Sequence, residues 1–209
     1  MPADRLHLVR HGEVHNPGRV LYGRLPEFRL SGAGRAMAAA AAAHVAGLER
    51  PVTALYASPL QRTRESAEPF AEAFGLDPVI DERIIEPTNV FEGKRMRRAV
   101  LNPGNWKYLS DPALPSWGEP YIEVVERMDA AMVAAWDAAE SGDVVLVSHQ
   151  LPIWITHLAV AGEPLRHDPR KRRCALSSVT SFERRGNEWR EVAYAEPATT
   201  ADAVDVGAV

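Results

Sequence analysis

The sequence has 209 residues, of which 46% are hydrophobic, and a formal net charge of -4. This size and apolar content fit one α/β domain, and the overall acidity excludes a general attraction to nucleic acid or anionic lipid. Because Cys174 is the only cysteine, an internal disulfide and a site of clustered thiolates are also excluded. Any affinity for phosphate must come from a local cluster of basic side chains.

The N-terminal apolar run is far too short for a signal peptide, and no other stretch approaches the ~20 apolar residues that a membrane span needs. We therefore expect a cytoplasmic protein that binds neither membranes nor nucleic acid. The sequence is compatible with a homodimer as well as with a monomer.

The first predicted strand covers residues 6–10, and the turn former Gly12 marks a sharp turn after it. His11 therefore lies at a strand tip. The alanine-rich segment Gly32–Ala46 predicts a helix, and Val52–Ala57 predicts a second strand.

The next helix begins with a recognisable pattern. Ser58 is suited to be its N-cap, Pro59 to be its first residue and Gln61 its third, as in a capping box. We expect this helix to continue to about Phe74, with a short strand at 78–81.

Residues 87–120 are rich in turn formers and predict a lid-like excursion with one short helix near 95–101. Apolar residues then recur every three or four positions over 121–140, which predicts an amphipathic helix.

The apolar run 143–147 is typical of a buried parallel strand, and it places His149 beyond its carboxyl end. Pro152 opens another helix. Residues 177–184 and 188–194 flank a turn and predict a terminal hairpin.

This alternation predicts an α/β fold, a three-layer α/β/α sandwich with a mostly parallel central sheet. Residues 1–195 form one domain in this prediction, and 196–209 form a loosely ordered tail. Ligands of such sheets bind beyond the carboxyl ends of the strands, where His11 and His149 both fall.

Five motifs follow one another along the chain: Leu8-Val9-Arg10-His11-Gly12-Glu13, Leu30-Ser31-Gly32-Ala33-Gly34, Ala57-Ser58-Pro59-Leu60-Gln61-Arg62-Thr63, the stretch 81–93 with Glu86 and Phe91-Glu92-Gly93, and Val147-Ser148-His149. In residues and in order they resemble the histidine phosphatase superfamily, also called phosphoglycerate mutase-like, over about residues 6–158.

The resemblance implies a phosphatase that hydrolyses a small phosphorylated metabolite without metal or other cofactor. It implies that His11 attacks phosphorus and becomes a phosphohistidine. Arg10, Arg62 and His149 would bind the phosphoryl oxygens.

Phosphate chemistry supports the same side chains independently. A phosphate monoester carries roughly -1.5 to -2 charges near neutral pH, and fixed guanidinium groups suit a transition state that spreads this charge over three oxygens. A neutral imidazole can attack phosphorus and divide one difficult displacement into two easier ones. Arg62 falls near the start of a helix, whose free amides favour the same anion.

In similar enzymes a carboxyl at the position of Glu86 protonates the leaving oxygen and later activates water. Burial near a phosphate would supply the raised pKa that this acid needs. Glu82 and Glu92 are the alternatives, because the spacing to Phe91-Glu92-Gly93 is one residue shorter than usual.

The chain departs from the family pattern at three further places. Asn16, an expected phosphate ligand, stands closer to the first motif than the family's asparagine. Gln150 replaces the usual glycine after His149, and Gly23-Arg24 differs locally, so these are candidate substrate contacts. A loop or capping role is the alternative for Asn16, Arg24 and Gln150.

One alternative is a metal site, because His7, His11 and His15 would share one face of a helix. A chelator would then abolish activity. The strand-like pattern argues against that helix, and the neighbouring arginines would repel a cation.

Two further alternatives concern function. The basic run 166–173 favours a catalytically silent module for phosphorylated ligands, although such a run is usually a solvated loop. A cofactor-dependent phosphoglycerate mutase would use the same core, but similar mutases carry longer insertions after the Glu86 region.

Overall fold

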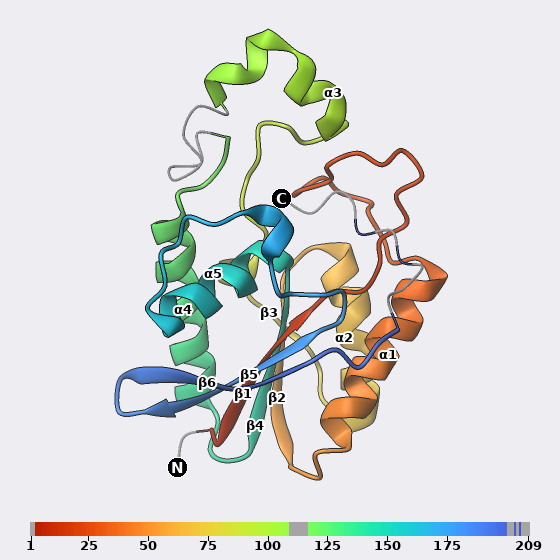
Figure 1. Ribbon diagram of the computed structural model, residues 1–209. Helices are drawn as coiled ribbons and strands as arrows, with labels where there is room; N and C mark the ends of the chain where they lie inside the picture. The colour runs from red at the N-terminus through yellow and green to blue at the C-terminus, as the bar shows by residue number, and fades with distance from the viewer. Residues whose placement is uncertain (1–2, 109–116, 200–202, 204, 206–209) are drawn as a thin grey trace.

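The protein is a three-layer sandwich (Figure 1) in a computed structural model that describes residues 3–108, 117–199, 203 and 205. Its strands are β1 (Arg5–Arg10), β2 (Val52–Ala57), β3 (Val79–Ile80), β4 (Asp143–Ser148), β5 (Val179–Arg185) and β6 (Glu188–Ala195). Its α-helices are α1 (Gly32–Ala46), α2 (Gln61–Phe74), α3 (Met96–Leu101), α4 (Tyr121–Ala138) and α5 (Gln150–Ala161). Short 3-10 helices cover Glu82–Ile84, Pro103–Tyr108 and Pro169–Lys171.

The six strands form one sheet in the order β3-β2-β4-β1-β5-β6. The first four of these strands are parallel, whereas β5 is antiparallel to β1 and β6 is antiparallel to β5. The predicted α/β sandwich with a mostly parallel sheet is therefore confirmed.

Two helical layers cover the sheet, with α1 and α2 on one face and α4 and α5 on the other (Figure 1). Neighbouring residues of each strand alternate between the layers, as the strand period requires. Leu8 and Leu146 pack toward α4 and α5. Val9, Val145 and Val147 pack toward α1 and α2. Both central strands thus bury apolar side chains on both faces, which explains why their sequences predicted them.

The predicted lid contains α3, as expected, and the 3-10 helix that follows it. In Figure 1, α3 stands above the carboxyl ends of the strands and apart from the three layers. Residues 109–116 of the predicted excursion, and 200–202, 204 and 206–209 of the predicted tail, lie outside the described residues.

The predicted capping role of Ser58 is wrong. Helix α2 begins at Gln61 with Leu60 as its N-cap residue, which makes no side-chain cap hydrogen bond. The Ser58 hydroxyl lies 2.7 Å from Nε2 of His149 instead. The capping pattern fails here because the Ser58 hydroxyl forms a hydrogen bond with a residue that is distant in sequence.

The turn after β1 is packed directly against the start of α1. A Cβ atom at Gly12 would lie 2.2 Å from the Gly34 carbonyl oxygen, whereas one at Gly32 would have nothing within 4 Å. We predict that Gly12→Ala lowers the free energy of unfolding by about 3 kcal/mol or more, since backbone must move. Gly32→Ala, the matched control, should leave stability unchanged or slightly raised. Urea unfolding of both variants measures this, and equal stabilities would contradict it.

Candidate active site

Strand register brings the site together. Arg10 of β1 pairs with Ser148 of β4, so the residues that follow, His11 and His149, lie side by side at adjacent strand tips. Their ring centroids are 5.3 Å apart. Ser58 follows β2 at the same edge, and its amide donates to the Val147 carbonyl.

His11 is held as a neutral imidazole. Its side chain is buried, and Nδ1 lies 2.8 Å from the Gly12 carbonyl oxygen. Because a carbonyl only accepts, Nδ1 carries the proton and Nε2 keeps its lone pair. Burial, with the charges of Arg62 and Arg10, lowers the pKa of His11 well below its ordinary value. An unprotonated nitrogen is therefore present at neutral pH.

His149 is fixed in the opposite tautomer. Nη2 of Arg62 lies 3.2 Å from Nδ1 of His149, and a guanidinium only donates. Nδ1 therefore accepts, and Nε2 donates to the Ser58 hydroxyl. Burial and the Arg62 charge lower the pKa of His149 well below its ordinary value. Both histidines are thus uncharged in this structure.

Two buried guanidinium groups face this pair. Arg10 comes from β1 and Arg62 from the first turn of α2. Nη2 of Arg62 also donates to the Gly23 carbonyl oxygen at 2.7 Å, and the guanidinium lies 4.7 Å from the centre of the Tyr22 ring. Among the described residues, Nε of Arg10 and Nε of Arg62 have no hydrogen-bond partner. Buried cationic donors of this kind favour a bound anion.

Glu86 supplies the carboxyl group. It is 2% exposed, and its Oε2 lies 3.6 Å from Nδ1 of His149. Burial raises the pKa of Glu86 above its ordinary value, against the opposing charges of Arg62 and Arg172. Of the alternatives, Glu82 is exposed, and Glu92 is half-buried and accepts from the Arg24 amide. Glu86 is therefore the one of the three carboxyls that lies beside His149.

The remaining predicted site residues have structural contacts. Asn16 bonds through both ends of its amide to the Val20 backbone. Nε of Arg24 donates to the Glu86 carbonyl oxygen at 2.5 Å, so Arg24 helps to hold the backbone of Glu86. Gln150 is half-buried, with Oε1 3.4 Å from Nη1 of Arg172. Phosphate or substrate binding by Asn16, Arg24 and Gln150 stays a prediction.

Sequence reasoning did not single out Arg172 or Asp205. Arg172, from the basic run, bonds through Nε to Nε2 of His167 at 2.8 Å, and its charge acts on Glu86. Asp205, from the predicted tail, pairs with Arg10. A basic run was a usable signal for Arg172, whereas no pattern near Asp205 indicated a partner 195 positions away.

The metal alternative fails on geometry, because the first segment is a strand. His7 is buried in the sheet, with Nδ1 2.8 Å from the Ser181 hydroxyl and Nε2 3.2 Å from Asp143, whereas His15 is exposed. Within the described part of the chain, no three His, Cys, Asp or Glu side chains gather as a metal site would require.

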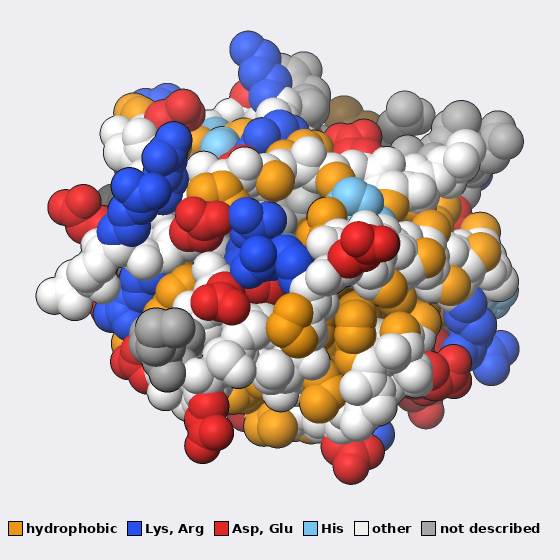
Figure 2. Space-filling view, turned by 90° about the horizontal axis from the view of Figure 1, so that it is seen from below, with side chains coloured by type: hydrophobic (Ala, Val, Ile, Leu, Met, Phe, Trp, Pro, Cys, Tyr) orange, Lys and Arg blue, Asp and Glu red, His pale blue; other side chains and the backbone are white. Residues whose placement is uncertain are grey.

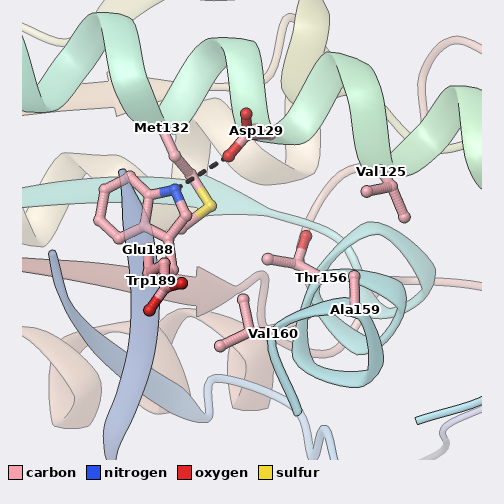
Figure 3. Close-up of a pocket in the computed structure, with 8 residues that line it drawn as sticks. All are labelled: Val125, Asp129, Met132, Thr156, Ala159, Val160, Glu188 and Trp189. Atoms are coloured by element: carbon pink, nitrogen blue, oxygen red, sulfur yellow. Dashed lines mark hydrogen bonds between the residues drawn. The ribbon is translucent and has the colours of Figure 1, made fainter. Parts of the chain in front are cut away.

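A hollow of about 340 Å³ lies between α4, α5 and β6, away from His11 and His149 (Figure 3). Trp189 donates to Asp129 across it, and its other polar lining residues are Thr156 and Glu188. This lining has acidic groups and no basic ones, so it does not suit phosphate. On the side of the molecule that is seen from below Figure 1, basic and acidic side chains are interspersed (Figure 2). No described helix combines the length and apolarity of a membrane span.

Comparison with known proteins identifies the family of this chain. The family model of the histidine phosphatase superfamily, branch 1, matches residues 6–197. An uncharacterized Mycobacterium tuberculosis protein, Rv0525, is 46% identical over 202 residues, covering 95% of this chain and 99% of its own. The probable phosphoglycerate mutase GpmB of Escherichia fergusonii is 29% identical over 185 residues, with 84% of each chain covered.

A solved structure, the mycobacterial glucosyl-3-phosphoglycerate phosphatase Rv2419c, superposes with a TM-score of 0.71 at 26% identity, covering 90% of this chain and 96% of its own. The family match extends over nearly all of β1 to β6, and His11, Arg62, Glu86 and His149 lie within it. The chain belongs to the histidine phosphatase superfamily.

Proposed function

We propose that this protein is a phosphatase that hydrolyses small phosphate monoesters through a phosphohistidine on His11. The observation that carries the proposal is the orientation of the His11 ring. Its Nδ1 is committed to the Gly12 carbonyl, which leaves the Nε2 lone pair for attack beside two buried guanidinium groups. Membership of the superfamily and likeness to a phosphatase of solved structure support the same chemistry.

In the first step, Nε2 of His11 forms a bond to phosphorus while the bond from phosphorus to the leaving oxygen breaks. Arg10 and Arg62 stabilise the charge on the equatorial oxygens. The leaving oxygen takes the proton of the Glu86 carboxyl group, which its raised pKa favours.

In the second step, the Glu86 carboxylate removes a proton from water, and the water oxygen attacks phosphorus. The bond between His11 and phosphorus breaks, which releases inorganic phosphate and restores the neutral imidazole and the protonated Glu86. Neither step uses a metal ion.

A panel of phosphate monoesters tests the proposal. It includes 3-phosphoglycerate with 2,3-bisphosphoglycerate, and both phosphate release and isomerisation are measured, with and without a chelator. We expect release to exceed isomerisation and to resist the chelator. Isomerisation exceeding release would establish a mutase instead. Loss of activity with the chelator would contradict the metal-independent mechanism.

Arg172 should set part of the pH dependence. The acid in the first step is protonated Glu86, so kcat/KM falls as pH rises through its pKa. The Arg172 charge holds that pKa down. We predict that Arg172→Gln moves the alkaline limb of the kcat/KM profile to higher pH.

Arg173→Gln is the matched control, because Arg173 pairs with Glu191 on the surface and stacks on Tyr194. Its profile should match that of the parent protein. A shift toward lower pH in Arg172→Gln, or equal shifts in both variants, would contradict this role of Arg172.

A further inference from the structure

The last strand brings the end of the chain back to the site. Because β5 is antiparallel to β1 and β6 to β5, β6 points in the same direction as β1 (Figure 1). Its last residue, Ala195, pairs with Val179, which in turn pairs with Val9 beside Arg10. The chain therefore leaves the sheet at the edge where His11 lies.

The start of the tail is tied to this edge. Tyr194 accepts from the Ala175 amide at 3.1 Å and donates to Glu196 at 2.7 Å. The neighbouring Cys174 carbonyl accepts from Nη1 of Arg10 at 2.7 Å. From Glu196, the ten residues that end at Asp205 can span at most about 33–36 Å when extended, and Asp205 contacts Arg10.

Asp205 binds the Arg10 guanidinium with both carboxylate oxygens. Nη1 of Arg10 donates to Oδ2 at 2.8 Å, and Nη2 donates to Oδ1 at 2.5 Å. Parallel bonds of this kind are also how arginine binds the oxygens of a phosphate. The Arg10 side chain is 0% exposed and that of Asp205 is 38% exposed. The carboxylate thus approaches a buried cation from the solvent side.

We propose that Asp205 is an intramolecular stand-in for the phosphoryl group, which holds Arg10 in the free protein and is displaced when a phosphorylated ligand binds. The same two nitrogens of Arg10 would bind either anion, so the two are mutually exclusive there. The inference rests on Arg10 being a phosphoryl ligand, as in the proposed function, but does not depend on hydrolysis.

Displacement is favoured by charge and by the number of partners. A carboxylate has one negative charge, whereas inorganic phosphate has more near neutral pH. Phosphate could also reach Nε of Arg10 and Nε of Arg62, which have no partner among the described residues. Competition lowers the apparent affinity by the fraction of molecules whose site is open, so a contact formed nine-tenths of the time weakens phosphate binding about tenfold.

The experiment measures binding of inorganic phosphate to the full chain by isothermal titration calorimetry. Asp205→Asn and Asp205→Ala both remove the charge, and Asp205→Asn keeps the size. We expect both variants to bind phosphate about three- to tenfold more tightly than the parent protein. Asp77→Asn is the matched control, because it removes the same charge from a side chain that is exposed. It should leave the affinity unchanged.

Unchanged affinity in both Asp205 variants would overturn the inference. Weaker binding would also overturn it, because Asp205 would then position Arg10 for phosphate. The proposed function is tested separately, by phosphate release from monoesters. If the Asp205 variants bind phosphate more tightly but the protein hydrolyses no monoester, the proposed function is contradicted and the role of Asp205 is supported.

Discussion

His11→Ala should abolish phosphate release from every monoester that the protein hydrolyses, with a loss in kcat of roughly 10⁶-fold, as when a covalent nucleophile is removed. The neutral Nε2 of His11 is the atom that forms the bond to phosphorus, and His149 cannot replace it. Both of its ring nitrogens are already bonded, to Arg62 and Ser58. Phosphate release is measured by steady-state assay, and the covalent intermediate by acid-labile labelling with a radioactive substrate.

His15→Ala is the control for this loss. His15 lies four residues further along the same segment and is exposed, so activity and labelling should be unchanged. His11→Ala should still bind inorganic phosphate, since Arg10 and Arg62 remain. Residual turnover above one-hundredth of the parent rate would contradict a phosphohistidine on His11.

Glu86→Gln should reduce kcat/KM by an amount that depends on the leaving group. For an alkyl phosphate, whose leaving oxygen is strongly basic, we expect a loss of roughly 10²–10⁴-fold, because a glutamine cannot supply the proton. For p-nitrophenyl phosphate, whose leaving oxygen needs no proton, the loss should be less than about tenfold. The comparison uses kcat/KM because this ratio reports the first step alone.

Glu82→Gln is the matched control, because it makes the same change at an exposed carboxyl in the same segment. It should leave kcat/KM for both substrates unchanged. Equal losses for the two substrates in Glu86→Gln would mean that Glu86 is not the acid, and that its burial beside His149 serves another purpose.

The elements with the clearest sequence signals were predicted within a residue or so. The runs at 6–10 and 143–147 became β1 and β4, and the alanine-rich helix has the predicted bounds Gly32–Ala46. These signals are local, because a strand buried on both faces must be apolar and a helix begins and ends at recognisable residues.

Ser58 shows where a local signal misleads. Its neighbours predict a helix cap, and a serine there would satisfy a free amide. In the folded protein His149, 91 positions away, takes the hydroxyl. A capping box describes only the residues of its own turn, so it cannot report a competing partner from another strand.

By itself the sequence determined the order of strands and helices, the motifs around His11, Arg62, Glu86 and His149, and hence the family. Only the tertiary structure decided the protonation pattern of the two histidines, the raised pKa of Glu86, and the contact of Asp205 with Arg10. The physical reason is that a hydrogen-bond partner and a degree of burial depend on which distant segments meet. Local patterns of residue types do not report these contacts between distant segments.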